Sequence, residues 1–150
     1  MDKEKRYKHI IEQLDELLKV TEFPFSRMAT TIALLHHKME EFSWTGYYLL
    51  YLNELFVGPY QGSLACQKLE KDKGVCWTSF NQNKTIIVPD VHKFEGHIAC
   101  DSRTNSEIVT PVHFRNGKIA GVLDIDSKNF NQFDEIDAIW LQKIAKMIYI

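Results

Sequence analysis

The chain has 150 residues, of which 45% are hydrophobic and 25% are charged, and its formal net charge is −2. This length fits one domain, residues 1–150, that can bury a core without disulfides or metals. The slightly acidic charge argues against nucleic acid and anionic membranes as partners, because both bind basic surfaces. No apolar run reaches membrane-spanning length and the N-terminal residues lack the apolar core of a signal peptide, so we expect a cytoplasmic protein.

Two helices are predicted at the start of the chain. Apolar residues recur at helical spacing over residues 3–19, which indicates an amphipathic helix. Pro24 suits the first turn of a second helix, and we expect that helix to run to about Met39.

The middle of the chain is rich in aromatic and β-branched residues, which favour strands. We expect residues 44–52 and 55–60 to pair across a short turn, followed by a short helix over 74–82 and a strand over 85–88. Residues 89–105 then form an irregular segment, and long ordered loops of this kind are often functional.

The dipeptide Asn116-Gly117 predicts a tight turn between strands at 107–114 and 118–127. Asp134 is a suitable N-cap for a last helix. The residues of that helix that we expect to face the core are Ile136, Ile139, Trp140, Ile144, Met147 and Ile148. The order of the elements predicts an α+β fold, in which helices pack on one side of an antiparallel sheet.

Acidic residues recur on the two strands of this hairpin. A two-residue turn sets Phe114 opposite Ile119 and, further along, Glu107 opposite Asp126, so that Glu107, Asp124 and Asp126 share one face. One interpretation is a solvated sheet surface, which is common in antiparallel sheets. The other is a site, in which the carboxyls bind a metal or an ammonium group, or one carboxyl stays protonated and donates its proton at neutral pH.

Aromatic residues and a glycine alternate on another strand. Trp44, Gly46 and Tyr48 share one face, and the glycine leaves a gap between the two aromatic side chains. Most such aromatic residues belong to a core. A hollow beside their rings would also suit an apolar, sulfur-containing or cationic ligand.

The three cysteines, Cys66, Cys76 and Cys100, have no CxxC spacing of the kind that binds zinc. Burial as small hydrophobic side chains is the usual fate of a free cysteine, and redox chemistry is the alternative. Cys100 differs from the other two because His97 and Asp101 surround it with polar groups in the segment HIACD.

Six motifs, in order along the chain, resemble those of the free methionine-(R)-sulfoxide reductases, small enzymes built on a single GAF domain. They are WTGYYLL (44–50), GPYQGSLAC (58–66), GVC (74–76), GHIACD (96–101), SEIVTPV (106–112) and GVLDIDS (121–127). The chain departs from the family pattern at Trp77, where members usually have Gly, and at Glu95, where they often have Pro. The resemblance implies a six-stranded antiparallel GAF sheet and an enzyme that reduces free, not peptide-bound, methionine-(R)-sulfoxide.

The resemblance also implies a role for each cysteine. By matching position, Cys100 is the catalytic thiol, Cys66 is the resolving thiol and Cys76 is an auxiliary one. We therefore expect Cys100 to attack the sulfoxide and become a sulfenic acid, which Cys66 converts to a disulfide. Thioredoxin, recycled by NADPH-dependent thioredoxin reductase, would reduce that disulfide, as part of the defence against oxidative stress.

Five further residues match the substrate site of the family. Glu107, Asp124 and Asp126 match its acids, with Glu107 also expected to act in catalysis, and Trp44 and Tyr48 match its aromatic wall. We expect no bound cofactor and no metal. A homodimer through the N-terminal helix is a further expectation, which the residues themselves do not decide.

Two other interpretations remain open. The main one is a GAF domain that binds a small ligand or senses redox state without turnover. The other is a metal site made of the acids with His97 and Cys100, although such a mixture of hard and soft ligands suits no one common metal.

Overall fold

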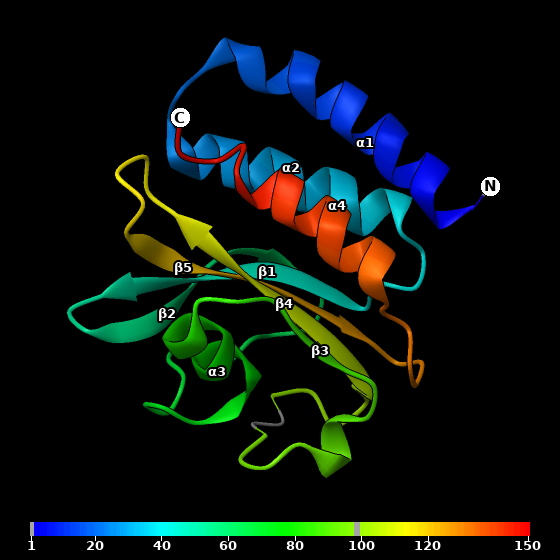
Figure 1. Ribbon diagram of the computed structural model, residues 1–150, viewed down its shortest axis with the longest axis vertical. Coiled ribbons are helices and arrows are strands. Elements are labelled where there is room, and N and C mark those ends of the chain that lie inside the picture. The colour runs from blue at the N-terminus through cyan, green and yellow to red at the C-terminus, as the bar shows by residue number, and fades with distance from the viewer. Residues whose placement is uncertain (1, 98–99) are drawn as a thin grey trace.

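The computed structural model describes residues 2–97 and 100–150, so Ile98 and Ala99 of the GHIACD motif lie outside the described residues. Five antiparallel strands form one sheet in the order β2-β1-β5-β4-β3. The strands are β1 (Trp44–Tyr51), β2 (Glu54–Gln61), β3 (Ile86–Val88), β4 (Ser106–His113) and β5 (Ile119–Ser127). Three long helices lie above this sheet and a short one lies below it (Figure 1).

The helices begin and end close to where the sequence patterns predict. The long ones are α1 (Lys3–Leu17), α2 (Pro24–Lys38) and α4 (Glu135–Ala145), and a 3-10 turn, η1 (Leu18–Val20), extends α1. Asp134 caps α4 as predicted, because its side chain accepts hydrogen bonds from the backbone N–H groups of Ile136 and Asp137. None of the described helices is long and apolar enough to cross a membrane.

The α+β fold with helices on one side of an antiparallel sheet is confirmed for α1, α2 and α4, but the sheet has five strands in the described part of the chain, not six. The segment after β2 comes near to forming another strand. That segment forms a single bridge between Phe56 and Lys68, supported by backbone hydrogen bonds from Val57 N to Gln67 O (2.9 Å) and from Leu69 N to Leu55 O (3.0 Å). Two hydrogen bonds align too few residues to count as a strand.

The turn between β4 and β5 differs from the predicted one. Phe114 N donates to Lys118 O (2.8 Å), so the loop has three residues, and Gly117 adopts a positive φ of 88° that suits glycine. Phe114 therefore does not face Ile119. A bulge between Val112 and His113 then shifts the register by one residue.

The bulge compensates for the longer loop. Beyond it, Glu107 pairs with Asp126, as the two-residue turn predicted, and Val109 pairs with Asp124. The three acids therefore share one face of the sheet although the predicted turn was wrong.

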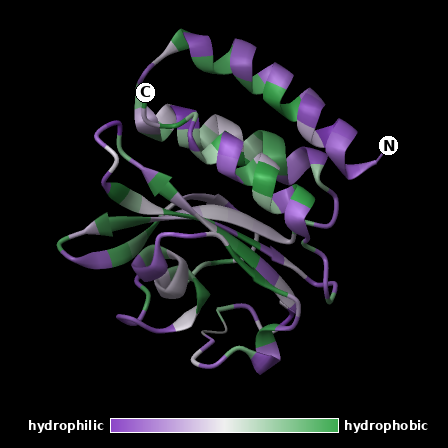
Figure 2. Ribbon diagram, in the orientation of Figure 1, coloured by the Kyte–Doolittle hydropathy of each residue, from purple (hydrophilic) through white to green (hydrophobic). Residues whose placement is uncertain are grey.

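The larger hydrophobic core fills the space between the sheet and the long helices (Figure 2). Part of the predicted stripe on α4 was wrong, since Ile136 and Ile139 are 38% and 46% exposed. The buried hydrophobic residues of this C-terminal segment are Ala138, Leu141, Ile144, Ala145 and Ile148. The small alanines on this face leave room for close packing, whereas the predicted stripe combined residues from two faces of a largely apolar helix.

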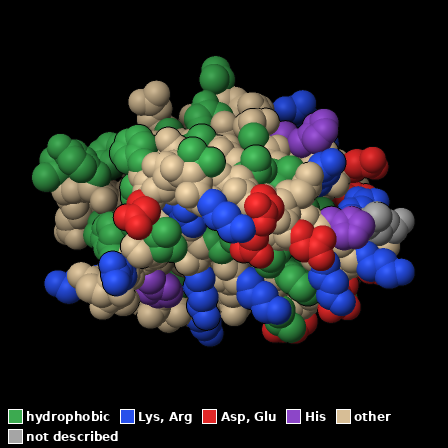
Figure 3. All heavy atoms as spheres, turned by 90° about the horizontal axis from the view of Figure 1, so that it is seen from above, with side chains coloured by type: hydrophobic (Ala, Val, Ile, Leu, Met, Phe, Trp, Pro, Cys, Tyr) green, Lys and Arg blue, Asp and Glu red, His purple; other side chains and the backbone are tan. Residues whose placement is uncertain are grey.

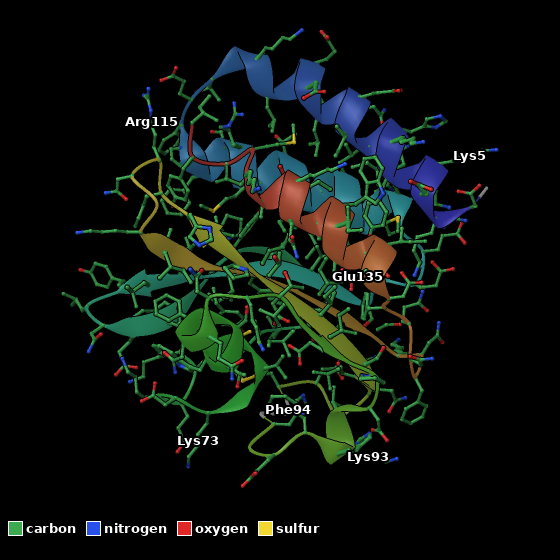
Figure 4. All side chains as sticks on the ribbon, in the orientation of Figure 1. Lys5, Lys73, Lys93, Phe94, Arg115 and Glu135 are labelled. Carbon is green, nitrogen blue, oxygen red and sulfur yellow. A yellow bond between two sulfur atoms is a disulfide. The ribbon has the colours of Figure 1, made fainter. Side chains whose placement is uncertain are left out.

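The opposite face of the sheet carries a second, smaller core. The short helix α3 (Gly74–Gln82) and the loops around it cover this face, and a 3-10 turn, η2 (Val91–Lys93), lies among those loops. Lys73 and Phe94 lie on this side, whereas Lys5 and Glu135 lie on the side of the long helices (Figure 4). The face that carries the three acids is therefore covered by protein.

Charged side chains are scattered over the surface that is seen from above the long helices, between hydrophobic and other side chains (Figure 3). Exposed hydrophobic residues also lie in and beside the connection between α1 and α2. These residues, the α1–α2 apolar cluster, are Leu17, Val20, Phe23 and Phe25.

Candidate active site

The three acids of β4 and β5 lie under α3, and their side chains are largely removed from solvent. Glu107 is 6% exposed and Asp124 is 5% exposed, while Asp126 is partly exposed. The interpretation of these residues as a solvated sheet surface is therefore wrong. Among the described residues, Oδ1 of Asp124 and Oδ1 of Asp126 have no hydrogen-bond partner, so both can accept a hydrogen bond from a ligand.

Burial and mutual repulsion change the ionisation of these acids. Burial, with the neighbouring charge of Asp126, raises the pKa of Glu107 to about 8. Burial and the adjacent carboxyls also raise the pKa of Asp124 and that of Asp126 well above the usual range. Because three close carboxyls in a low dielectric cannot all carry charge, the cluster holds protons at neutral pH. It can therefore donate a proton.

Cys66 and Cys100 form a disulfide, with their Cα atoms 5.6 Å apart although 34 residues separate them in the chain. Cys66 is partly buried and Cys100 is exposed, so a reductant in solution can reach the bond. The structure thus joins the two cysteines that the family resemblance pairs.

Cys76 is a free thiol buried in the first turn of α3. Its Sγ and carboxylate oxygens of Glu107 and Asp124 lie within 4.8 Å of one another. Burial and these acids raise the pKa of Cys76 well above its usual value, so the thiol stays protonated and is a poor nucleophile. His97 and Cys100, which the sequence offered as metal ligands with the acids, are not members of this group.

Trp44 and Tyr48 pack against each other on one face of β1, but the gap predicted at Gly46 is absent. The Trp44 and Tyr48 rings stack with their centroids 5.8 Å apart. A Cβ atom at Gly46 would lie 2.5 Å from Cη2 of Trp44, so the indole itself fills the space over the glycine. The glycine makes room for the Trp44 ring, so the predicted gap over Gly46 is filled, whereas the cavity lies beside the two rings.

Hydrogen bonds connect this wall to the segment that carries Cys66. Trp44 Nε1 donates to the carbonyl oxygen of Ser63 (3.1 Å), and Tyr48 OH donates to the carbonyl oxygen of Cys66 (3.0 Å). The two aromatic residues therefore set the position of one end of the disulfide.

His97 lies beside the acids. Its Nε2 lies 3.6 Å from Oε1 of Glu107. Burial lowers the pKa of His97, so the ring is mostly neutral at pH 7 and does little to stabilise a thiolate.

Every predicted site residue except Cys66 lines one cavity, and Cys66 is bonded to Cys100 in its wall. Ser63 and Asp101 also line this cavity, and sequence reasoning gave them no role. The available signal was their closeness to the two bonded cysteines in the sequence, since Ser63 lies three residues before Cys66 and Asp101 directly follows Cys100. The arrangement combines an accessible sulfur pair, a proton donor, unpaired carboxylate oxygens and an aromatic surface, which suits reduction of a small polar substrate that contains sulfur.

Comparison with known proteins gives the same picture. The GAF domain family matches residues 14–148. The chain is 44% identical to GAF domain-containing protein A of Dictyostelium discoideum, over 97% of this chain and 92% of that protein. It is 37% identical to the free methionine-R-sulfoxide reductase of Escherichia coli (strain K12), over 99% of this chain and 89% of that protein. The X-ray structure of free methionine-R-sulfoxide reductase from Neisseria meningitidis in complex with its substrate is similar with a TM-score of 0.93 and 36% identity, and the match covers 99% of this chain and 89% of that one.

Proposed function

Because the chain belongs to the free methionine-R-sulfoxide reductases of the GAF-domain family, we propose that it reduces free L-methionine-(R)-sulfoxide through a sulfenic acid on Cys100 and a disulfide with Cys66. The observation that carries this proposal is the Cys66–Cys100 disulfide beside a cavity that also holds the buried acids. A ligand-binding or sensing domain has no need of an accessible sulfur pair and a proton donor in the same cavity.

The first step is attack at sulfur. A sulfoxide has a positive sulfur and a negative oxygen, so reduction needs a nucleophile at sulfur and a proton on oxygen. The Cys100 sulfur bonds to the substrate sulfur, and the protonated oxygen then moves from the substrate sulfur to the Cys100 sulfur. The substrate S–O bond and the transient S–S bond break, methionine leaves, and Cys100 becomes a sulfenic acid. Glu107 supplies the proton, because its raised pKa keeps it protonated near neutral pH.

The second step regenerates the thiol. Cys66 attacks the sulfenic acid, water leaves and the Cys66–Cys100 disulfide forms. Thioredoxin then reduces this disulfide by thiol–disulfide exchange, with NADPH as the ultimate electron source. The exposure of Cys100 supports an external reductant of this kind.

Selectivity for the free amino acid follows from the acids. The ammonium group of free methionine sulfoxide can donate to the unpaired oxygens of Asp124 and Asp126. A peptide-bound residue has no ammonium group and would leave these oxygens unpaired in a closed site, which costs binding energy. Trp44 and Tyr48 give the S-methyl end an apolar surface.

The test is NADPH consumption with thioredoxin and thioredoxin reductase. Free methionine-(R)-sulfoxide is compared with the free (S) form and with an N-acetylated (R) form, and Cys100→Ser is the control. We expect turnover of the free (R) form alone, lost in the variant. An absence of turnover with all three compounds overturns the proposal and favours the sensor interpretation.

Two further expectations concern composition and assembly. The absence of a bound metal stays a prediction, and metal analysis of protein purified without chelator tests it.

We also propose a homodimer that buries the α1–α2 apolar cluster, because exposed apolar groups favour association. Light scattering measures the loss of dimer in Phe25→Ser. Leu52→Ser is the control, because it replaces an equally apolar residue that is distant from the cluster. A monomeric wild-type protein contradicts the proposed dimer.

A further inference from the structure

The two cysteines of the disulfide lie on loops that are anchored in different ways. The loop over residues 62–66 is attached to β1 by the hydrogen bonds of Trp44 to Ser63 O and of Tyr48 to Cys66 O. Gly62 begins this loop at a positive φ of 124°, where a Cβ atom would lie 2.8 Å from Ser43 O. The Cys66 loop is therefore attached to the sheet by contacts that do not involve the disulfide.

The loop over residues 100–104 is organised around Asp101 instead. One carboxylate oxygen accepts hydrogen bonds from the backbone N and Nε of Arg103, at 2.9 and 3.0 Å, and the other accepts from Nη2 at 3.0 Å. These contacts hold the pKa of Asp101 well below its usual range, so the side chain stays ionised. Asp101 directly follows Cys100, and its carboxylate is only 16% exposed.

One hydrogen bond connects the two loops. The hydroxyl of Ser63 donates to Oδ2 of Asp101 at 2.9 Å. Within residues 2–97 and 100–150, it is the one hydrogen bond between the 62–66 loop and the 100–104 loop. A hydroxyl that donates to a carboxylate makes a stronger bond than one that donates to a neutral acceptor. Since Ser63 is three residues before Cys66 and Asp101 is next to Cys100, this bond spans the same gap as the disulfide.

We propose that Ser63 and Asp101 are positioning residues that hold the Cys66 and Cys100 loops together while the disulfide is open. This inference rests on the proposed function and adds a role in one step of it. In that step the Cys66 thiol attacks the Cys100 sulfenic acid, the S–S bond forms, the S–O bond breaks, and the oxygen leaves as water with the thiol proton and the hydroxyl proton. The Ser63–Asp101 bond raises the effective concentration of Cys66 at Cys100 and so accelerates disulfide closure.

The positioning role predicts that mutation of Ser63 affects methionine formation and disulfide closure differently. Reduced Ser63→Ala is mixed with free methionine-(R)-sulfoxide, without thioredoxin, and quenched at short times. We expect methionine to form at the wild-type rate and the disulfide to close about tenfold more slowly, in line with the loss of one hydrogen bond to a charged group. The Cys100 sulfenic acid should accumulate and be trapped by a 1,3-dicarbonyl reagent. The reduction potential of the pair should become less negative by about 30 mV, the equivalent of the same tenfold factor.

Matched variants separate positioning from folding. Ser63→Thr keeps the hydroxyl and should restore closure, and Ser102→Ala, which removes an exposed hydroxyl from the Cys100 loop, should behave as wild type. Asp101→Asn should slow closure, and the Ser63→Ala/Asp101→Asn double variant should be no slower than the slower single variant.

The failures of the two proposals are distinguishable. If the wild-type protein forms no methionine, the proposed function fails. If the wild-type protein forms methionine, two results make the positioning role wrong. In one, Ser63→Ala closes the disulfide at the wild-type rate. In the other, Ser63→Ala slows methionine formation as much as it slows disulfide closure.

Discussion

Glu107 on β4 and Asp126 on β5 are direct cross-strand partners on the covered face of the sheet. Like charges in such positions repel, and burial under α3 raises the cost of ionising both. The pair therefore holds a proton at neutral pH, and the pKa of Glu107 is raised to about 8. Burial, together with the pairing, converts an ordinary carboxyl into an acid that can protonate a leaving oxygen.

Replacement of Glu107 by Gln keeps the shape of the side chain and removes the proton donor. We expect kcat for free methionine-(R)-sulfoxide to fall about a hundredfold or more, the usual contribution of a general acid. Steady-state kinetics of Glu107→Gln measure this, with the exposed Glu95→Gln as the matched control. Near-wild-type kcat in Glu107→Gln would remove this residue from the mechanism.

The pH dependence of turnover should report the same group. Glu107 must be protonated to act, and its pKa is about 8. The rate of turnover should therefore stay constant below pH 8 and fall as the pH rises through about 8. The measurement is methionine formation in a single turnover from pH 6 to pH 10, which separates this group from the pH dependence of thioredoxin. A rate that rises steadily to pH 10 contradicts the assignment.

Stability should depend on pH through the same carboxyl. Its folded pKa of about 8 lies above the unfolded value near 4.5, so between these values the folded protein binds a proton that the unfolded chain has lost. The free energy of unfolding should therefore fall with rising pH across this window, by up to about 1.4 kcal/mol per pH unit for each such group. Urea unfolding at several pH values should show a shallower decrease for Glu107→Gln than for wild type. If the free energy of unfolding fell equally with pH in both proteins, the proton would be bound by a group other than Glu107.

Cys76 should be dispensable for the disulfide. Its thiol is buried and its pKa is raised, and the sulfur pair forms without it. We expect Cys76→Ser to keep turnover within severalfold of wild type, whereas Cys66→Ser should stop after one turnover. Mass spectrometry of the oxidised variants identifies the bonded pair. Loss of multiple turnover in Cys76→Ser would make Cys76 the resolving thiol.

Gly46 should be required for the aromatic wall. A Cβ atom there would lie 2.5 Å from Trp44 Cη2 and 2.5 Å from Tyr60 Cβ, so alanine must displace the indole. We expect Gly46→Ala to raise KM for the free sulfoxide and to change the fluorescence of Trp44. An unchanged KM with full stability contradicts the role of Trp44 in binding.

The amino-acid sequence by itself determined the local structure and the composition of the site. Helical spacing located α1, Pro24 located the start of α2, and alternation along β4 and β5 placed Glu107, Asp124 and Asp126 on one face. These patterns follow from the regular spacing at which side chains along a helix or a strand point to the same face. They can therefore be recognised from the order of the residues alone. The predicted pairing of β4 with β5 was correct at the acids, because a bulge compensated for a loop that is one residue longer than predicted.

Only the tertiary structure decided what surrounds those side chains. Alternation identifies a face but not the element that covers it, so the burial of the acids under α3, and with it the pKa of Glu107, depended on packing. The same limit explains the exposure of Ile136 and Ile139 on a helix that is apolar on more than one face. The hydrogen bond between Ser63 and Asp101 and the 5.6 Å separation of the Cα atoms of Cys66 and Cys100 join distant parts of the chain, and no local pattern encodes such contacts.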